Sequence, residues 1–242
     1  MVGKSQIKLI KSLQQKKARN KHKLFVVEGK KTVEELLRSS IEVYTVLSTD
    51  ENFIQAQGNL GTLISAAEMK LMSALKNPSA VLGVFHIPKT PKYSANDWVV
   101  VLDDVRDPGN LGTIIRLCDW FGIKNLICST TTVDCFNPKV LQATMGSISR
   151  VDIRYTDLPI FLAKTDVPVY GAFMDGAVVY KEKIPKKGIL IMGNEANGIS
   201  EEIKAFCSRK VSIPQFGSAS TESLNVATAT SILLNEIRRV SF

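Results

Sequence analysis

Short apolar runs alternate with amphipathic segments along the first third of the chain. Residues 23–29 (KLFVVEG) predict a strand that ends at a glycine, and residues 32–39 (TVEELLRS) predict a short amphipathic helix. The same rhythm continues through the strand-like segments 41–48, 60–65 and 81–87 and the helical segment 66–75. Alternating helices and strands of this kind predict a small α/β domain.

The rhythm stops at residues 87–97 (IPKTPKYSAND), where two prolines stand among Ser, Asn and Asp. Such a composition is typical of a linker between domains. The boundary is therefore predicted near Tyr93, which divides the chain into residues 1–92 and residues 93–242.

Beyond the linker the apolar strands are short and continuous instead of alternating with polar residues. They are interleaved with helical segments, among them 138–145 (PKVLQATM), 199–207 (ISEEIKAFC) and the final 223–239. Predicted strands cover 98–103 (WVVVLD), 125–129 (NLICS), 167–173 (VPVYGAF), 188–193 (GILIMG) and 210–214 (KVSIP). Strands that are apolar on both faces predict a mainly parallel sheet covered by helices on each side.

Positive charge is concentrated in the first predicted domain. The net charge is +8, and residues 1–92 hold 15 Lys and Arg against 7 Asp and Glu, whereas residues 93–242 hold 16 of each. A surface of this kind suits a polyanion such as RNA, because each neutralised phosphate releases counterions. The alternative is a basic helix or frayed arm that is merely solvated.

The remaining composition narrows the class of protein. A chain of 242 residues with 45% hydrophobic residues is long enough to bury a proper core, and it has no run of 18 apolar residues. The lysine-rich start lacks the apolar stretch of a signal peptide, so a cytoplasmic protein without a membrane partner is expected. The four cysteines form no C-x-x-C pair, so no metal site is predicted, and Cys118 and Cys128 stand in apolar runs typical of reduced core thiols.

Three polar corners follow predicted strands of the second domain, where ligands of open α/β sheets bind. They are residues 107–110 (DPGN), 193–198 (GNEANG) and the long loop 214–225 (PQFGSASTESLN). The polar residues in and after these corners also have ordinary explanations. Glu195 can be a surface acid, Arg116 a side chain that extends to solvent from a packed helix, and Ser223 a helix cap. The occurrence of three such corners in one domain favours a ligand-binding or catalytic site.

Several common sites are absent from the sequence. The chain contains neither G-x-x-x-x-G-K-[ST] nor a G-x-G-x-x-G after residues 98–103, so neither a P-loop nor a dinucleotide fold is supported. Both histidines, His22 and His86, lie outside the second domain, which argues against a Ser-His-Asp hydrolase.

The corners belong to longer motifs that are specific to one family. Residues 102–122 (LDDVRDPGNLGTIIRLCDWFG), 189–200 (ILIMGNEANGIS) and 213–229 (IPQFGSASTESLNVATA) resemble, in order, the three motifs of the SpoU (TrmH-like) branch of the SPOUT RNA methyltransferases. Residues 23–88 resemble the amino-terminal, ribosomal-protein-L30e-like RNA-binding domain of that family.

The resemblance implies methylation of a ribose 2'-hydroxyl in rRNA or tRNA, with rRNA favoured and S-adenosylmethionine as the methyl donor. It also implies a homodimer whose catalytic domain, residues 93–242, is tied in a trefoil knot. Catalytic roles carry over to Asn110, Arg116, Glu195, Ser223 and Asn225. Cofactor binding carries over to Met192, Gly193, Asn194, Ile213, Pro214 and Leu224.

Some points stay open at this stage. The third motif is about two residues longer than usual, so positions 216–222 have no certain counterpart. Arg116 is either the general base that the family mechanism implies or a group that binds phosphate and stabilises the forming alkoxide. The final helix carries Val226, Ala229, Leu233 and Ile237 along one stripe, which fits a subunit interface or ordinary core. A non-catalytic RNA-binding or ribosome-assembly protein that keeps the fold is the alternative function.

Overall fold

A computed structural model describes residues 2–89, 93, 96–217 and 223–239. Contacts divide the chain into two compact units, one of Met1–Lys89 with Asp134–Ser149 and one of Thr90–Val133 with Arg150–Phe242. This division starts the second unit close to Tyr93, as the linker composition suggests, but it assigns residues 134–149 to the first unit. Each unit is described below by itself.

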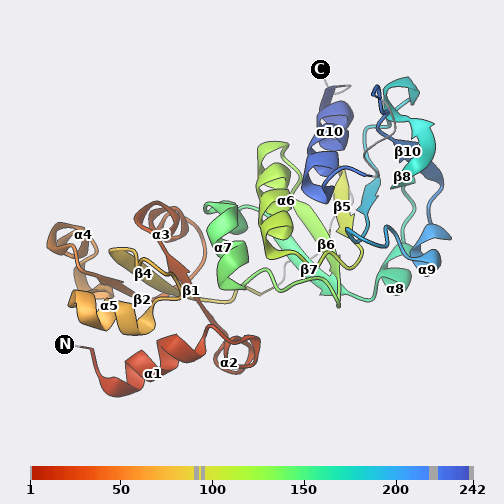
Figure 1. Ribbon diagram of the computed structural model, residues 1–242. Helices are drawn as coiled ribbons and strands as arrows, with labels where there is room; N and C mark the ends of the chain where they lie inside the picture. Colours follow the sequence, from red (N-terminus) through yellow and green to blue (C-terminus); the bar gives the residue numbers. More distant parts are fainter. Residues whose placement is uncertain (1, 90–92, 94–95, 218–222, 240–242) are drawn as a thin grey trace. The chain divides into compact units, whose positions relative to one another are not determined.

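The first unit is built on a four-stranded mixed sheet with the order β1-β4-β2-β3 (Figure 1). Strand β4 is antiparallel to β1 and β2, and β3 is parallel to β2. The strands are β1 (Leu24–Glu28), β2 (Val43–Ser48), β3 (Gly61–Leu63) and β4 (Val81–His86). The helices are α1 (Lys4–Ser12), α2 (Lys16–His22), α3 (Lys30–Leu37), α4 (Glu51–Gln55), α5 (Ala66–Met72) and α7 (Pro138–Thr144), with short 3₁₀ turns at Gly58–Leu60 and Ser147–Ser149.

The basic start of the chain forms two helices, and its charges divide into two groups. Seven lysines of α1, α2 and the residue after them are exposed: Lys4, Lys8, Lys11, Lys16, Lys17, Lys21 and Lys23. Arg19 differs from them, because its side chain is only 3% exposed. It donates to the carbonyl oxygens of Leu13 and Gln14 at 2.8 Å and pairs with Asp134, whose Oδ2 lies 2.5 Å from Nη2. Arg19 therefore fastens α2 to the unit, and the lysines remain available to an anion.

The second unit is a six-stranded sheet in which every pairing is parallel, with the order β10-β8-β9-β5-β6-β7. The strands are β5 (Val99–Leu102), β6 (Asn125–Ser129), β7 (Asp152–Thr156), β8 (Val169–Val178), β9 (Ile189–Met192) and β10 (Arg209–Ser212). The helices are α6 (Pro108–Trp120), α8 (Leu158–Leu162), α9 (Glu201–Lys204) and α10 (Val226–Arg239), with a 3₁₀ turn at Val179–Lys181. The predicted parallel sheet is confirmed, and the trefoil knot stays a prediction.

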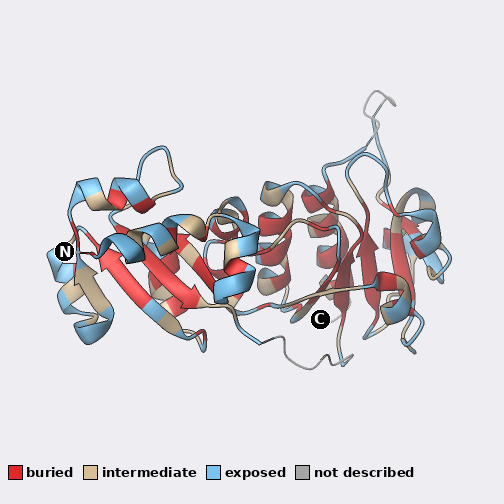
Figure 2. Cartoon of the chain, turned by 90° about the horizontal axis from the view of Figure 1, so that it is seen from below, coloured by how far each residue is buried: buried red, intermediate tan, exposed pale blue. Residues whose placement is uncertain are grey.

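The central strands are buried on both faces, which explains their continuous apolar sequence. Val99, Val101, Ile189 and Ile191 share one core cluster with side chains of α8 and α9. Leu190 points the other way and packs near two residues of α10. Figure 2 shows the strands of both sheets buried, while the helices keep exposed outer faces.

One detail differs from the sequence-based prediction, and another decides between two alternatives that the prediction left open. The polar strand β7 was not expected, because Asp152–Thr156 has no apolar run, yet it pairs with β6 over its whole length. The stripe on the final helix belongs to the core of this chain: Val226, Leu233 and Ile237 are at most 7% exposed. None of the helices within the described ranges is long and apolar enough to cross a membrane.

Candidate active site

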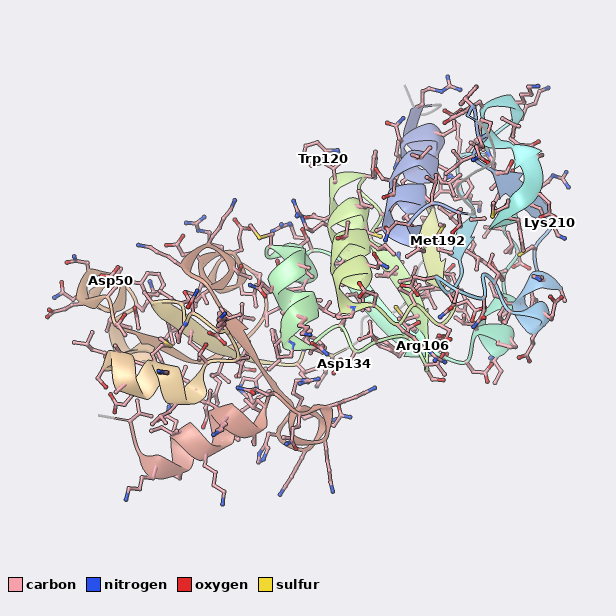
Figure 3. All side chains as sticks on the ribbon, in the orientation of Figure 1. Asp50, Arg106, Trp120, Asp134, Met192 and Lys210 are labelled. Atoms are coloured by element: carbon pink, nitrogen blue, oxygen red, sulfur yellow. The ribbon has the colours of Figure 1, made fainter. Side chains whose placement is uncertain are left out.

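The predicted corners meet at one edge of the second sheet. Because β5 pairs in parallel with both β6 and β9, the carboxyl ends of these three strands lie at the same edge. Helix α6 starts there: the Asp107 carboxylate accepts a hydrogen bond of 2.8 Å from the Asn110 backbone N–H, and Pro108 occupies the first turn. In Figure 3, Arg106 lies at this end of α6 and Trp120 at the other.

Asn110 is the centre of a hydrogen-bonded chain of three side chains. Its Nδ2 donates to Glu195 Oε1 at 2.9 Å, and its Oδ1 accepts from Asn225 Nδ2 at 2.8 Å. A carboxylate can only accept, so Glu195 fixes which end of the Asn110 amide faces it. Asn225 is fixed in turn, because its Oδ1 accepts from the backbone of Ala227 and Thr228 at the start of α10. Three segments far apart in sequence thus hold one polar array.

The turn after β9 presents Glu195 through a tight backbone arrangement. Asn194 and Gly198 exchange two backbone hydrogen bonds of 2.9 Å, and the Asn194 side chain accepts from the N–H groups of residues 196 and 197. Gly193 has no room for a side chain, because a Cβ there would lie 2.2 Å from the carbonyl carbon of Gly198. The glycine at 193 is therefore required by close backbone approach.

The sequence-based assignment missed the residues that join this turn to the end of β5. The buried Asp103 carboxylate accepts from the Ser200 N–H at 2.8 Å, and Asn194 Nδ2 donates to the Asp104 carbonyl at 2.8 Å. Two adjacent carboxylates directly after an apolar strand were the available signal. These hydrogen bonds make the first and second motifs one rigid corner.

Arg116 and Ser223 are not joined to the Asn110 array within one chain. Arg116 is exposed in the middle of α6, and within the described part of the chain it has no hydrogen-bond or ion-pair partner. It shares an exposed stripe with Thr113 and Trp120, whose side chain is 84% exposed. Ser223 is exposed just ahead of α10, and no hydrogen bond between described residues links it to the array. Both assignments stay predictions.

The predicted cofactor residues follow two strands that end at the same sheet edge. Met192 is the buried last residue of β9, and Ile213 and Pro214 are partly buried directly after β10. Leu224 is 49% exposed. The apolar side chains of Met192, Ile213 and Pro214, next to a turn in which Gly193 lies against the backbone of Gly198, fit a nucleoside such as that of S-adenosylmethionine. Part of the lengthened third motif, residues 218–222, lies outside the described residues.

Two of the cysteines belong to the core. No disulfide joins any of the four, all of which lie within the described residues, and Cys118 and Cys128 are fully buried, which confirms the prediction for these two. Burial raises the pKa of the Cys118 thiol well above its ordinary value, so it is not a nucleophile at neutral pH.

Comparison with known proteins finds a family match for each part of the chain. Residues 97–235 match the SpoU rRNA Methylase family, and residues 4–83 match the MRM3-like substrate binding domain. The 23S rRNA (guanosine(2553)-2'-O)-methyltransferase RlmP of Bacillus subtilis is 33% identical over 236 residues, which are 94% of each chain.

Two solved structures extend the match to the whole fold. A putative RNA methyltransferase of the TrmH family from Porphyromonas gingivalis has a TM-score of 0.89 and 35% identity, covering 99% of both chains. An AdoMet-bound rRNA methyltransferase from Sinorhizobium meliloti has a TM-score of 0.86 and 31% identity, covering 100% of this chain and 97% of that one.

The parallel-sheet domain, the polar array at its edge and these matches together define an RNA methyltransferase. More narrowly, the chain belongs to the SpoU rRNA Methylase family, as the match over residues 97–235 shows. The resemblance drawn from the three motifs is thereby confirmed.

Proposed function

We propose that the protein transfers a methyl group from S-adenosylmethionine to a ribose 2'-hydroxyl of rRNA. The observation that carries the proposal is the Glu195–Asn110–Asn225 chain of hydrogen bonds at the carboxyl edge of the sheet. Relatives named as 23S rRNA 2'-O-methyltransferases and an AdoMet-bound relative support the substrate class and the donor.

S-adenosylmethionine would be held by the backbone and apolar side chains that follow β9 and β10. Bound there, it supplies an electrophilic methyl group on a sulfonium. The residues proposed to hold it are Met192, Gly193, Asn194, Ile213, Pro214 and Leu224. None of them is required as a nucleophile, since the attacking atom belongs to the ribose.

The side chains of the array have to position the ribose oxygen and favour loss of its proton. Amides such as Asn110 and Asn225 do not titrate, so they orient a hydroxyl without changing charge. Orientation of reacting groups can lower a barrier by about 7–11 kcal/mol. Glu195 keeps the Asn110 amide in the orientation described above, and Ser223 is proposed to add a hydroxyl to the same array.

Arg116 is proposed to supply the positive charge that the reaction requires. A guanidinium stays protonated at neutral pH, so it suits binding of an RNA phosphate or stabilisation of the forming alkoxide. Because the side chain faces solvent without a partner in the described part of its own chain, we propose that Arg116 of one protomer completes the site of a second protomer. The exposed Trp120 on the same stripe of α6 supports a homodimer that forms through this helix.

The RNA would also contact the first unit. Seven exposed lysines on α1, α2 and the following residue carry no opposing acid before Glu28, which favours binding to phosphates. With rRNA as the substrate, we propose that the protein acts in the cytoplasm.

The test replaces Arg116 with alanine. Arg116→Ala is expected to abolish methylation of rRNA while calorimetry still detects S-adenosylmethionine binding at wild-type affinity. Arg209→Ala, at an exposed arginine on the first residue of β10, is the matched control and should keep full activity. Near wild-type turnover of Arg116→Ala would refute the assignment of this arginine.

A wild-type protein that binds rRNA but not S-adenosylmethionine would instead identify a non-catalytic RNA-binding protein. Mapping of 2'-O-methyl groups in total RNA from cells with and without the gene would identify the nucleotide.

A further inference from the structure

The loop between β5 and α6 contains a non-glycine residue in left-handed backbone conformation. Asp104 has φ +59°, a conformation that costs a non-glycine residue on the order of 1 kcal/mol and that aspartate tolerates better than most. Its backbone is held on both sides: the N–H donates to Ser129 Oγ at 3.0 Å, and the carbonyl accepts from Asn194 Nδ2 at 2.8 Å. The neighbouring strand ends therefore impose this conformation.

The Asp104 carboxylate uses its two oxygens for different partners. Oδ2 lies 3.3 Å from Asn194 Nδ2, and Oδ1 accepts a hydrogen bond of 3.0 Å from Arg106 Nε. The Asp104 side chain is 22% exposed, whereas the Arg106 side chain is 71% exposed. Only Nε of Arg106 is occupied among the described residues, so both terminal nitrogens are available at the surface of the corner.

Arg106 also lies within electrostatic reach of the proposed active site. The hydrogen bond to Asp104 raises the pKa of Arg106 above its ordinary value, and the nearby Glu195 raises it further. Glu195 is the residue that holds the Asn110 amide. Through Asp104 and Asn194, a cation is thus held on the same rigid corner as the polar array.

The charges of the two turns show why a cation is needed there. Residues 103–110 and 193–200 contain four carboxylates, those of Asp103, Asp104, Asp107 and Glu195, and Arg106 is their one basic side chain. RNA that brings its ribose to this corner carries a phosphate on each side of that ribose. Phosphates next to four carboxylates would be repelled unless a positive group met one of them.

We propose that Arg106 binds a phosphate of the RNA backbone next to the methylated ribose. The planar guanidinium is anchored through Nε and presents its two terminal nitrogens, which is the geometry that binds two oxygens of one phosphate. As an exposed ion pair with Asp104 alone, Arg106 would contribute little to stability. This inference rests on the proposed function, because it concerns how the same site takes its RNA.

The experiment compares Arg106→Gln and Arg106→Lys with Arg209→Gln as the exposed control. Methyl transfer to rRNA that lacks the modification is measured as a function of RNA concentration. Arg106→Gln should raise the KM for RNA about tenfold, with kcat within about threefold of wild type. It should also reduce, by about one, the slope of the logarithm of the RNA association constant against the logarithm of the salt concentration. The KM of Arg106→Lys for RNA should lie between those of wild type and Arg106→Gln, because an ammonium keeps the positive charge but lacks the planar pair of donor nitrogens of a guanidinium.

Unchanged KM in Arg106→Gln would overturn the proposal. So would a fall in kcat at constant KM, since that result would mean that Arg106 acts by positioning Glu195. The S-adenosylmethionine affinity and the Tm of each variant should equal those of wild type, and a loss of either would assign a structural role instead.

The readout remains valid if the proposed function fails. In that case the wild-type protein transfers no methyl group to rRNA, and filter binding of the same rRNA is used to compare the three variants. Arg106→Gln should then bind RNA more weakly than Arg209→Gln, and equal affinities would overturn the phosphate contact.

Discussion

Removal of the Asn110 side chain tests the polar array most directly. Asn110→Ala deletes a donor to the Glu195 carboxylate and an acceptor for Asn225. A hydrogen bond to a charged group contributes about 1.5–3 kcal/mol and a neutral one about 0.5–1.5 kcal/mol, so the two together contribute about 2–4.5 kcal/mol. Only the part realised in the transition state slows the reaction. At about 1.4 kcal/mol per factor of ten, kcat should fall by up to roughly 30-fold to 1500-fold.

The assay is transfer of a labelled methyl group to rRNA that lacks the modification, with thermal unfolding measured in parallel. Asn110 is only partly buried, so water can replace its partners and the free energy of unfolding should change by less than about 1 kcal/mol. Asn137→Ala is the matched control, because Asn137 caps α7 in the first unit and lies outside the array. A kcat for Asn110→Ala within threefold of wild type would refute the role of the array.

Three further outcomes are expected. Gly193→Ala should weaken S-adenosylmethionine binding more than about tenfold in calorimetry, because the added methyl would overlap the backbone at 198. Gly217→Ala should bind normally, because apart from its chain neighbours no atom of the described residues lies within 4 Å of the new Cβ. Burial opposes the charged form of Asp97, but hydrogen bonds from Arg238 and the Trp98 N–H keep the pKa of Asp97 below 3.8. The stabilisation by ionised Asp97 is therefore present above pH 3.8 and is lost as the pH falls through the lower pKa of Asp97 in the folded protein. The Tm difference between wild type and Asp97→Asn should accordingly shrink from about pH 6 to about pH 3. A difference that stays constant over this range would contradict the prediction. Replacement of Lys4, Lys8 and Lys11 by glutamine should weaken rRNA binding and flatten its salt dependence, by about 0.7–0.9 of slope for each phosphate that is no longer neutralised, and an unchanged slope would place the RNA elsewhere.

Much of the fold was predictable because the strands of the second unit are buried on both faces. Residues 125–129 were predicted as a strand and form β6 with those limits. The polar β7 escaped prediction, because its place in the sheet depends on pairing with β6 and not on its own apolar residues. The membership of residues 134–149 in the first unit depends on interactions such as the ion pair between Arg19 and Asp134, which leave no local signal.

The candidate site was predictable to a similar degree. Asn110, Glu195 and Asn225 could be predicted as site residues because they follow strand ends and belong to the family motifs. The structure brings these three side chains together. Asp104 and Arg106 were not singled out, because their significance depends on a left-handed backbone and on hydrogen bonds to Ser129 and Asn194. The roles of Arg116 and Ser223 stay predictions.

The first unit has a consequence for synthesis of the chain, because its residues are not contiguous. Phe25 is fully buried, and its ring centroid lies 4.7 Å from that of Phe136, which is encoded 111 positions later. Arg19 likewise pairs with Asp134, its one counter-ion within the described ranges. On the ribosome, the amino-terminal sheet must therefore wait, with an uncovered aromatic and an unmatched cation, until residues up to 149 have emerged from the exit tunnel.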